Sequence, residues 1–433
     1  MSGDPAELRP LSDSSDGGRG PAVETSRRTR ADVINARNAT ATVFISNGFL
    51  MASWVARIPA ARSSLHLSPG HLGLLLLCPA IGSALALPTA GHVVLRLGPQ
   101  GAIRVFAVVC AGGTVLAGAG VSAHQPLVAA LGLFFFGLGT SLWDVAMNVE
   151  GAAVEQALTR SIMPRFHAAW SLGGVAGALV AAGFAALGPP LVVHLAITST
   201  IALVCAELAS HWFLAADPHT DAAPAPPRAA LRAWTERRTL LIGLVTLSAA
   251  LVEGVANDWF GLSLVDGYHQ RQVIGSLGFG VFVTMMTIGR TFGTAVIDRY
   301  GRITTLRVSA LTAAIGVILV VAGPWVPIAI LGGMLWGAGA ALGFPMGMSA
   351  AADDPVWAAP RLGVVTSIGY LAFLAGPPLV GFVADGVGVR RAVAVVLVAL
   401  VVIAVLAPVE RPLEVGGGPR GTPMGSGDGG LTS

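Results

Sequence analysis

Long apolar runs, separated by short polar stretches, recur along this chain from Val33 almost to the C-terminus. Each run reaches roughly 20 residues, which lets an α-helix cross a hydrocarbon core of about 30 Å. Every backbone polar group in such a core needs an internal partner. The pattern predicts an all-α polytopic membrane protein with twelve transmembrane helices. We expect spans at 33–56, 70–92, 102–122, 126–151, 163–187, 190–213, 238–265, 272–296, 304–323, 326–350, 361–386 and 389–409.

The longest polar connection, Ala215 to Glu236, divides these spans into six and six. It is rich in Pro and in charged residues, which is the composition of a linker. The first thirty residues and the Gly-rich end from Gly416 are polar and predict disordered tails. We therefore expect five parts: a cytoplasmic tail 1–32, a six-helix half 33–213, a cytoplasmic linker 214–237, a six-helix half 238–409 and a cytoplasmic tail 410–433.

The two halves share sequence markers. Phe136–Gly139 in span four matches Trp336–Gly339 in span ten at an offset of 200 residues. Trp54 with Leu72-Gly73 recurs 205 residues later. Internal duplication of this kind predicts parallel repeats around an axis normal to the membrane, with a solute site between them near the midplane. The paired Gly residues also predict close helix packing.

Composition excludes several classes of protein. Hydrophobic residues make up 54% of the chain and charged residues 11%, against about 25% charged in soluble domains. All 26 basic residues are Arg, so a Walker A loop, which needs Lys, is absent and direct ATP drive is not expected. The three Cys lie in apolar runs and predict packing, not a disulfide or metal site. We expect no cofactor and no nucleic-acid partner.

The distribution of Arg predicts the orientation. With a cytoplasmic N-terminus, five Arg fall outside and Arg290 lies within a span, while the rest of the 26 fall inside, as the positive-inside rule requires. The outer set is Arg57, Arg62, Arg271, Arg390 and Arg391. We expect a multi-pass protein of the cell inner membrane with both termini cytoplasmic. An eleven-span alternative would move the last two of these Arg inside.

Ionisable residues within the spans are the main functional candidates. One near the bilayer centre costs roughly 2.5–3.5 kcal/mol and so needs a partner, a wet cavity or a proton. Asp144, Asn148 and Glu155 on span four lie within about 40° on a helical wheel. Span seven repeats the acid-then-Asn spacing with Glu253 and Asn257. The two pairs predict polar stripes in both halves.

Several motifs match a known family. The loop after span eight, Gly293–Arg302, reads GTAVIDRYGR and is similar to the cytoplasmic loop signature of the major facilitator superfamily with one extra residue. Over 33–410 the chain resembles that superfamily, and in particular its bacterial MosC-like group. The motifs behind the narrower resemblance are Asp144–Asn148, Phe166–Ala168 with Ser171 and Gly173, Glu253 with Asp258-Trp259, Met286–Arg290 and Gly376–Pro378.

The resemblance implies that spans one, four, seven and ten line a central cavity. Asp144 with Asn148, and Glu253 with Asn257, then become candidates for proton coupling and solute binding. Alternatively, Asp144 pairs with His167 and only joins two helices. Glu253 has no obvious basic neighbour in its own half.

Three other side chains belong to the predicted cavity. His167 could relay protons, although a packing role is the plainer interpretation. Asn47 and Trp54 on span one could offer an amide and a stacking face to solute. For Trp54 we favour a place in the interfacial aromatic belt.

Charged residues near the membrane surfaces predict two gates. Arg57 ends span one and Asp258 ends span seven, so a salt bridge between them would close the outer side. The inner gate is predicted from Arg290, Asp298, Arg299, Arg302, Asp353, Asp354 and Arg361. The equivalent loop of the first half, Gly91–Gly98, lacks the family's acidic residue, so the inner lock would depend on Asp298.

The expected function is secondary active transport of a small solute by alternating access, with proton-coupled symport as the first choice. Export by proton antiport of a metabolite or drug is the alternative, although span five lacks the Gly-Pro motif of drug antiporters. A non-transporting membrane sensor is an alternative of another class. No enzyme motif is present. We expect a monomer whose partners are the solute, the proton and the lipid bilayer, and a cavity that suits neutral polar or weakly basic solutes.

Overall fold

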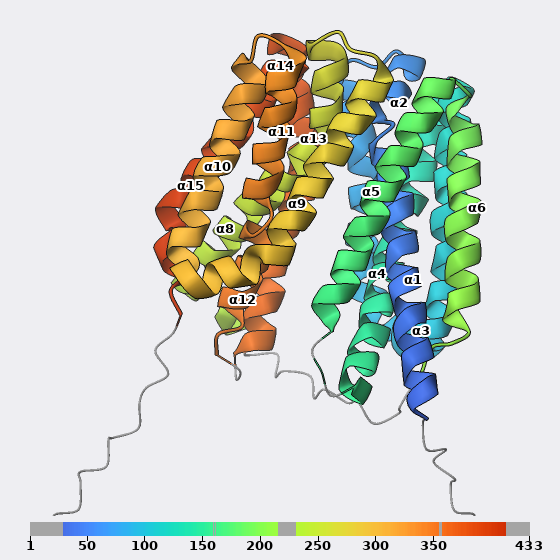
Figure 1. Cartoon of the computed structure of the whole chain (residues 1–433), viewed down its shortest axis with the longest axis vertical. Helices are drawn as coiled ribbons and strands as arrows, with labels where there is room; N and C mark the ends of the chain where they lie inside the picture. Colours follow the sequence, from blue (N-terminus) through green and yellow to red (C-terminus); the bar gives the residue numbers. More distant parts are fainter. Residues whose placement is uncertain (1–28, 159, 161, 215–230, 355–356, 413–433) are drawn as a thin grey trace, which may run out of the picture.

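The computed structural model describes residues 29–158, 160, 162–214, 231–354 and 357–412, and these contain helices and no strand (Figure 1). The predicted tails and most of the predicted linker lie outside the described residues. The helices are α1 (Arg30–Val55), α2 (Ile58–Leu65), α3 (Pro69–Ser122), α4 (Pro126–Leu158), α5 (Met163–Leu187), α6 (Leu191–Ser210), α8 (Arg237–Val255), α9 (Gln272–Tyr300), α10 (Arg302–Ala322), α11 (Val326–Ala340), α12 (Gly343–Ala351), α13 (Ala358–Val387), α14 (Val389–Ala392) and α15 (Val396–Leu406). Short π-helical turns η1 (Ala256–Phe260) and η2 (Ser263–Gly267) extend α8, and 3₁₀ turns η3 (Val393–Val395) and η4 (Ala407–Glu410) flank α15.

Eleven of the described helical segments are long and apolar enough to cross a membrane. One of them, α3, has 54 residues, about 81 Å at 1.5 Å per residue, which is more than twice the hydrocarbon thickness. Its backbone leaves the helix at Gly98, where φ is 68° and ψ is 163°, a conformation that Gly adopts without a steric penalty. Because α3 is two spans joined at this kink, the predicted twelve spans are confirmed.

The same packing recurs in both halves. A side chain on Gly137 of α4 would collide with the Pro79 carbonyl, and one on Gly337 of α11 would collide with the Phe282 carbonyl. Gly98 and Gly301, 203 residues apart, share the same positive-φ backbone. The duplication is therefore visible in three dimensions. The match of Leu72 to Leu277 at offset 205 lies two residues out of this structural register.

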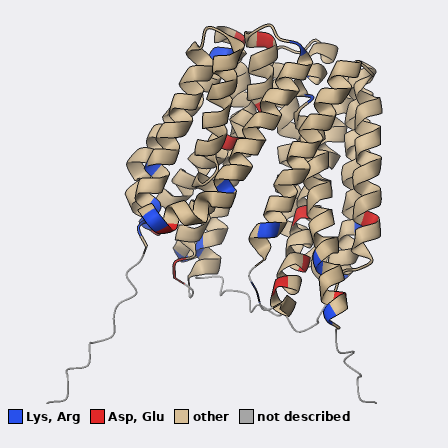
Figure 2. Ribbon diagram, viewed as in Figure 1, with Lys and Arg blue, Asp and Glu red and all other residues tan. Residues whose placement is uncertain are grey.

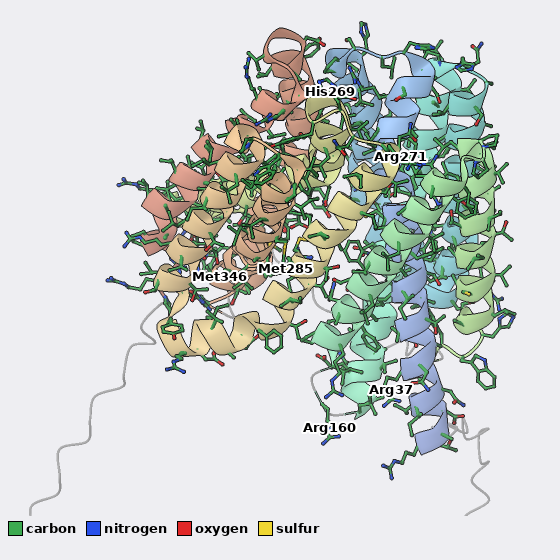
Figure 3. All side chains as sticks on the ribbon, turned by 45° about the horizontal axis from the view of Figure 1, so that its top comes forward. Arg37, Arg160, His269, Arg271, Met285 and Met346 are labelled. Carbon is green, nitrogen blue, oxygen red and sulfur yellow. The ribbon has the colours of Figure 1, made fainter. Side chains whose placement is uncertain are left out.

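The two halves stand side by side (Figure 1). Between them α3 packs against α13, and α5 packs against α9. We call the end where α1 begins and α15 ends the terminal side, and the end that carries α2 and α14 the hairpin side. Figure 3 places Arg37 and Arg160 at the terminal side, and His269 and Arg271 at the hairpin side. This division agrees with the predicted alternation of the spans.

The polar contacts that the structure gives between the halves lie at the hairpin side. Asp385 Oδ1 accepts a hydrogen bond from the Gly70 amide at 3.0 Å, and Ser276 Oγ donates to the Ala56 carbonyl at 2.7 Å. Arg62 forms an ion pair with Asp266 across the same boundary. These contacts hold the hairpin side closed.

The close approach at Gly137 yields a stability prediction. Gly137→Ala places a methyl group against the Pro79 backbone, and such overpacking costs about 1–3 kcal/mol. We expect a lower apparent Tm of the detergent-solubilised protein, measured by fluorescence. Gly112→Ala is the matched control because a Cβ there has nothing within 4 Å. Equal Tm values for the two variants would contradict this packing.

Candidate functional site

A cavity of about 320 Å³ lies between the halves, within the range of small-molecule sites. Residues from α1, α3, α4 and α5 form one wall, and residues from η1 and α13 form the other. The polar and aromatic lining residues are Asn47, Trp54, Ser83, Phe136, Thr140, Ser141, Asp144, Trp170, Asp258, Tyr370 and Phe373. The cavity is therefore shared by both repeats, as duplication of the chain predicts.

Two carboxylates face this cavity from opposite halves. Asp144 is midway along α4, and Asp258 is in the π-helical turn η1. Neither forms an ion pair with any residue that the structure describes. Asn148, predicted to act with Asp144, donates Nδ2 to the Asp144 backbone carbonyl at 2.8 Å. Asn148 thus holds its own helix at this point and does not line the cavity.

The position of Asp258 corrects the prediction that it closes the outer gate. The Asp258 carboxylate lies at the cavity and is not paired with Arg57, which is 4% exposed and leaves Nε and Nη1 without hydrogen-bond partners. A π-helical turn holds more residues than an α-helical one, so it rotates the following side chains away from α-helical positions. The cross-half ion pair is Arg62–Asp266 instead.

Asn47 presents an unused donor at the cavity. Its Oδ1 accepts a hydrogen bond from Trp170 Nε1 at 2.9 Å, which fixes the amide. Its Nδ2 has no hydrogen-bond partner among the described residues, although Asn47 is only 3% exposed. Asn47 was predicted to bind solute, and it lies where a solute acceptor atom could satisfy it.

Aromatic side chains form much of the cavity wall. Trp54 is 2% exposed and lines the cavity, so the prediction that it belongs to the interfacial belt is wrong. Tyr370 and Phe373, one turn apart on α13, have ring centroids 5.9 Å apart. Sequence analysis missed both, because one helical wheel does not tell which face of span eleven meets the other half.

Glu253 does have a basic neighbour. Arg290 Nη2 of α9 lies 2.8 Å from Glu253 Oε2 of α8, so the prediction that Glu253 lacks one in its half is wrong. Arg290 is joined to this acid and not to the predicted inner gate. Glu253 and the half-buried Asn257 do not line the cavity. Two charged residues within adjacent spans were a signal for this pair, since each needs compensation.

Neither Glu155, from the expected polar stripe of α4, nor His167 of α5 lines the cavity. Glu155 Oε2 accepts hydrogen bonds from the Ile162 and Met163 amides, both at 2.7 Å, at the start of α5. His167 is exposed and lies edge-on to Phe44, 5.4 Å between centroids. The structure gives no hydrogen bond between His167 and Asp144, so the suggested pairing of the two helices through them is not formed.

The predicted inner-gate residues separate into groups within one half. Arg302 Nη1 lies 2.7 Å from Asp353, which also binds Arg238 at 2.9 Å. Arg361 binds Glu236 at 2.7 Å. Arg361 also lies 3.5 Å from Asp354, and the Arg299 guanidinium lies over the Tyr300 ring at 5.5 Å. These groups tie α8, α10, α12 and α13 together at the terminal side.

Asp298, on which the inner lock was expected to depend, is exposed. It forms no ion pair with the residues that the structure describes. With the hairpin side closed and Asp298 unpaired, the terminal side lacks the lock that the loop signature predicts. Its pairing remains a prediction for another conformation.

The chain is similar to known membrane transporters along most of its length. The model of the Major Facilitator Superfamily matches residues 39–359. An uncharacterized transporter from Sinorhizobium fredii is 32% identical over 375 residues, 85% of this chain and 96% of the relative. The membrane protein MosC from Rhizobium meliloti is 27% identical over 369 residues, 84% of this chain and 88% of MosC. The solved nucleoside transporter NupG has a similar fold, with TM-score 0.68, 14% identity, and coverage of 87% of this chain and 98% of NupG.

The Glu236–Arg361 pair yields a pH prediction. The hydrogen bond from Arg361 lowers the pKa of Glu236, so the pair stabilises the fold above the unfolded value of about 4.3 and is lost as pH falls through the lower folded value. Glu236→Gln should cost about 1 kcal/mol or less at pH 7. The Tm difference from wild type should shrink near pH 4. A constant difference would contradict the pair's contribution.

Proposed function

Because this chain belongs to the major facilitator superfamily, we propose that it moves a small solute by proton-coupled secondary transport, with symport as the primary mode. The cell inner membrane, with both termini cytoplasmic, is the proposed location. The hairpin side would then face outward. Closure of that side and the unpaired Asp298 at the other favour an inward-facing state.

The observation that carries this proposal is the unpaired Asp144 carboxylate at the cavity. An ionised carboxylate near the bilayer centre is costly, so protonation there changes the free energy of the surrounding state by several kcal/mol. A proton and a solute that both bind one state better than the other shift the alternating-access equilibrium together. Such shared preference is what coupling requires.

Asp144 suits this role better than Glu253. Arg290 compensates the Glu253 charge at 2.8 Å. This ion pair stabilises the ionised carboxylate, so protonation of Glu253 is less favourable. Asp258, at the same cavity and without an ion pair, is the second candidate. We therefore place proton binding on the two cavity acids, and give the Glu253–Arg290 pair the task of joining α8 to α9.

Antiport export is the alternative mode, and it would require the solute and the proton to compete for one group. If a single cavity carboxylate bound either a proton or a solute, the two would compete and exchange across the membrane. Two carboxylates at one cavity allow simultaneous occupancy, which symport needs. Symport therefore requires the solute and the proton to bind together, whereas antiport requires them to exclude each other.

Asp144→Asn tests the coupling. Solute-induced pH change in proteoliposomes would be screened with polyols, sugars and amines. Asp144→Asn should abolish proton movement with the active solute while leaving counterflow exchange, because the amide keeps the shape but cannot take up the proton. Direction of the pH change relative to solute flux separates symport from antiport.

Glu253→Gln is the comparison variant. It should retain proton movement if it folds, although loss of its partner leaves Arg290 uncompensated and should lower expression or Tm. Normal coupling in Asp144→Asn would show that Asp144 is structural. Normal coupling in both Asp144→Asn and Asp258→Asn would end the proposed mechanism while leaving solute transport intact.

A further inference from the structure

The charge of the cavity is one-sided. Among the residues that the structure describes, its lining includes Asp144 and Asp258 and no Arg or His. Arg57, the basic residue nearest in sequence to the lining, is not among the lining residues, and Arg290 is paired with Glu253. In a site of low dielectric, two carboxylates without basic partners attract a cation and oppose an anion strongly.

The walls of the cavity suit an organic cation better than a bare metal ion. Trp54 and Trp170 come from one half, while Tyr370 and Phe373 come from the other. An ammonium group is attracted to the faces of such rings, most strongly where water is excluded. A metal ion would instead need several oxygen ligands in a close shell, and no group of three acids, His or Cys capable of holding one occurs in the described residues.

Asn47 adds a requirement for oxygen on the solute. Trp170 occupies the amide oxygen at 2.9 Å, which leaves Nδ2 as a buried donor without an acceptor. A buried donor without an acceptor has lost its hydrogen bond to water and is destabilising. A hydroxyl, ether or carbonyl oxygen on the solute would remove that cost.

We propose that the solute is a small organic cation, an amine or quaternary ammonium that also carries an oxygen acceptor. Its positive group binds between the cavity carboxylates and the aromatic walls, and its oxygen accepts from Asn47 Nδ2. This inference rests on the proposed transport function and specifies the class of its substrate. One carboxylate can hold the cation while the other holds a proton, so both ligands fit the same site.

Binding is tested first in detergent, apart from transport. The probes are choline, ethanolamine and glucosamine, each compared with its uncharged counterpart, dimethylbutanol, ethylene glycol and glucose. Tryptophan fluorescence and thermal shift report binding, since Trp54 and Trp170 line the cavity. At least one cation should bind tenfold or more tightly than its uncharged counterpart, and Asp258→Asn should weaken that cation tenfold or more.

Asp32→Asn is the matched control, because it removes an acid at the exposed start of α1. It should leave cation binding unchanged. Equal binding of each cation and its uncharged counterpart would overturn the proposal, as would the absence of binding by every cation. The proposal would also be overturned if Asp258→Asn bound the cation with the affinity of the wild type.

Asn47→Ala tests the oxygen contact. Choline, which has a hydroxyl, should lose about tenfold in affinity, whereas tetramethylammonium, which has none, should bind the variant and the wild type alike. An equal loss for both cations would mean that Asn47 only supports the cavity wall.

Transport measurements distinguish this inference from the function on which it rests. A neutral or anionic solute that drives proton movement in proteoliposomes would refute the cation class and leave the transporter standing. A cation that binds through Asp258 but moves no protons and shows no counterflow would support the cation class and refute the proposed transport function.

Discussion

The cost of an uncompensated charge in hydrocarbon governs how this molecule is built. Charged residues gather toward the two ends of the bundle, and few appear between them (Figure 2). Those within the membrane meet the cost in two ways. Glu253 and Arg290 neutralise each other inside one half, whereas Asp144 and Asp258 lie where the halves leave a cavity. The first solution gives a fixed joint, and the second leaves a group that can change its state.

Small residues bring the backbones of the two halves close together. A side chain on Gly73 would strike the Pro377 backbone, and one on Gly381 would strike that of Pro69. Close backbone approach of this kind gives packing energy without interlocked large side chains. The halves can therefore hold together at the hairpin side through a few polar contacts, and separate there without dismantling either core. The fully buried Trp143, Trp259 and Trp336 belong to α4, η1 and α11.

Much of the fold follows from the sequence, because membrane spans are set by length and apolarity. The break at Gly98 was predicted as the boundary between spans two and three, and Gly137 and Gly337 were predicted as sites of close packing. Side-chain pairing was much less accessible. Choosing Asp266 over Asp258 as the acid of the cross-half ion pair requires the rotation that η1 and η2 give the end of span seven, and no periodic pattern reports a π-helical turn. Asp144 could be identified from the sequence because an acidic residue within an apolar span is conspicuous by itself. The position of Tyr370 at the cavity depends on which face of α13 meets the other half, and the sequence does not reveal that face.

The depth of Asp144 has an electrical consequence. It stands near the middle of α4, which runs from Pro126 to Leu158. If Asp144 is the proton-binding group, as we propose, a proton that reaches it from the closed side crosses roughly half of the membrane potential. A full crossing is worth about 2.3 kcal/mol per charge at 100 mV, and half of it about 1.2 kcal/mol. The resting voltage of the cell would thus alter the occupancy of this carboxylate by close to an order of magnitude, with no change in pH on either side. The membrane potential would then shift the conformational equilibrium of the protein in the same way that a bound ligand does.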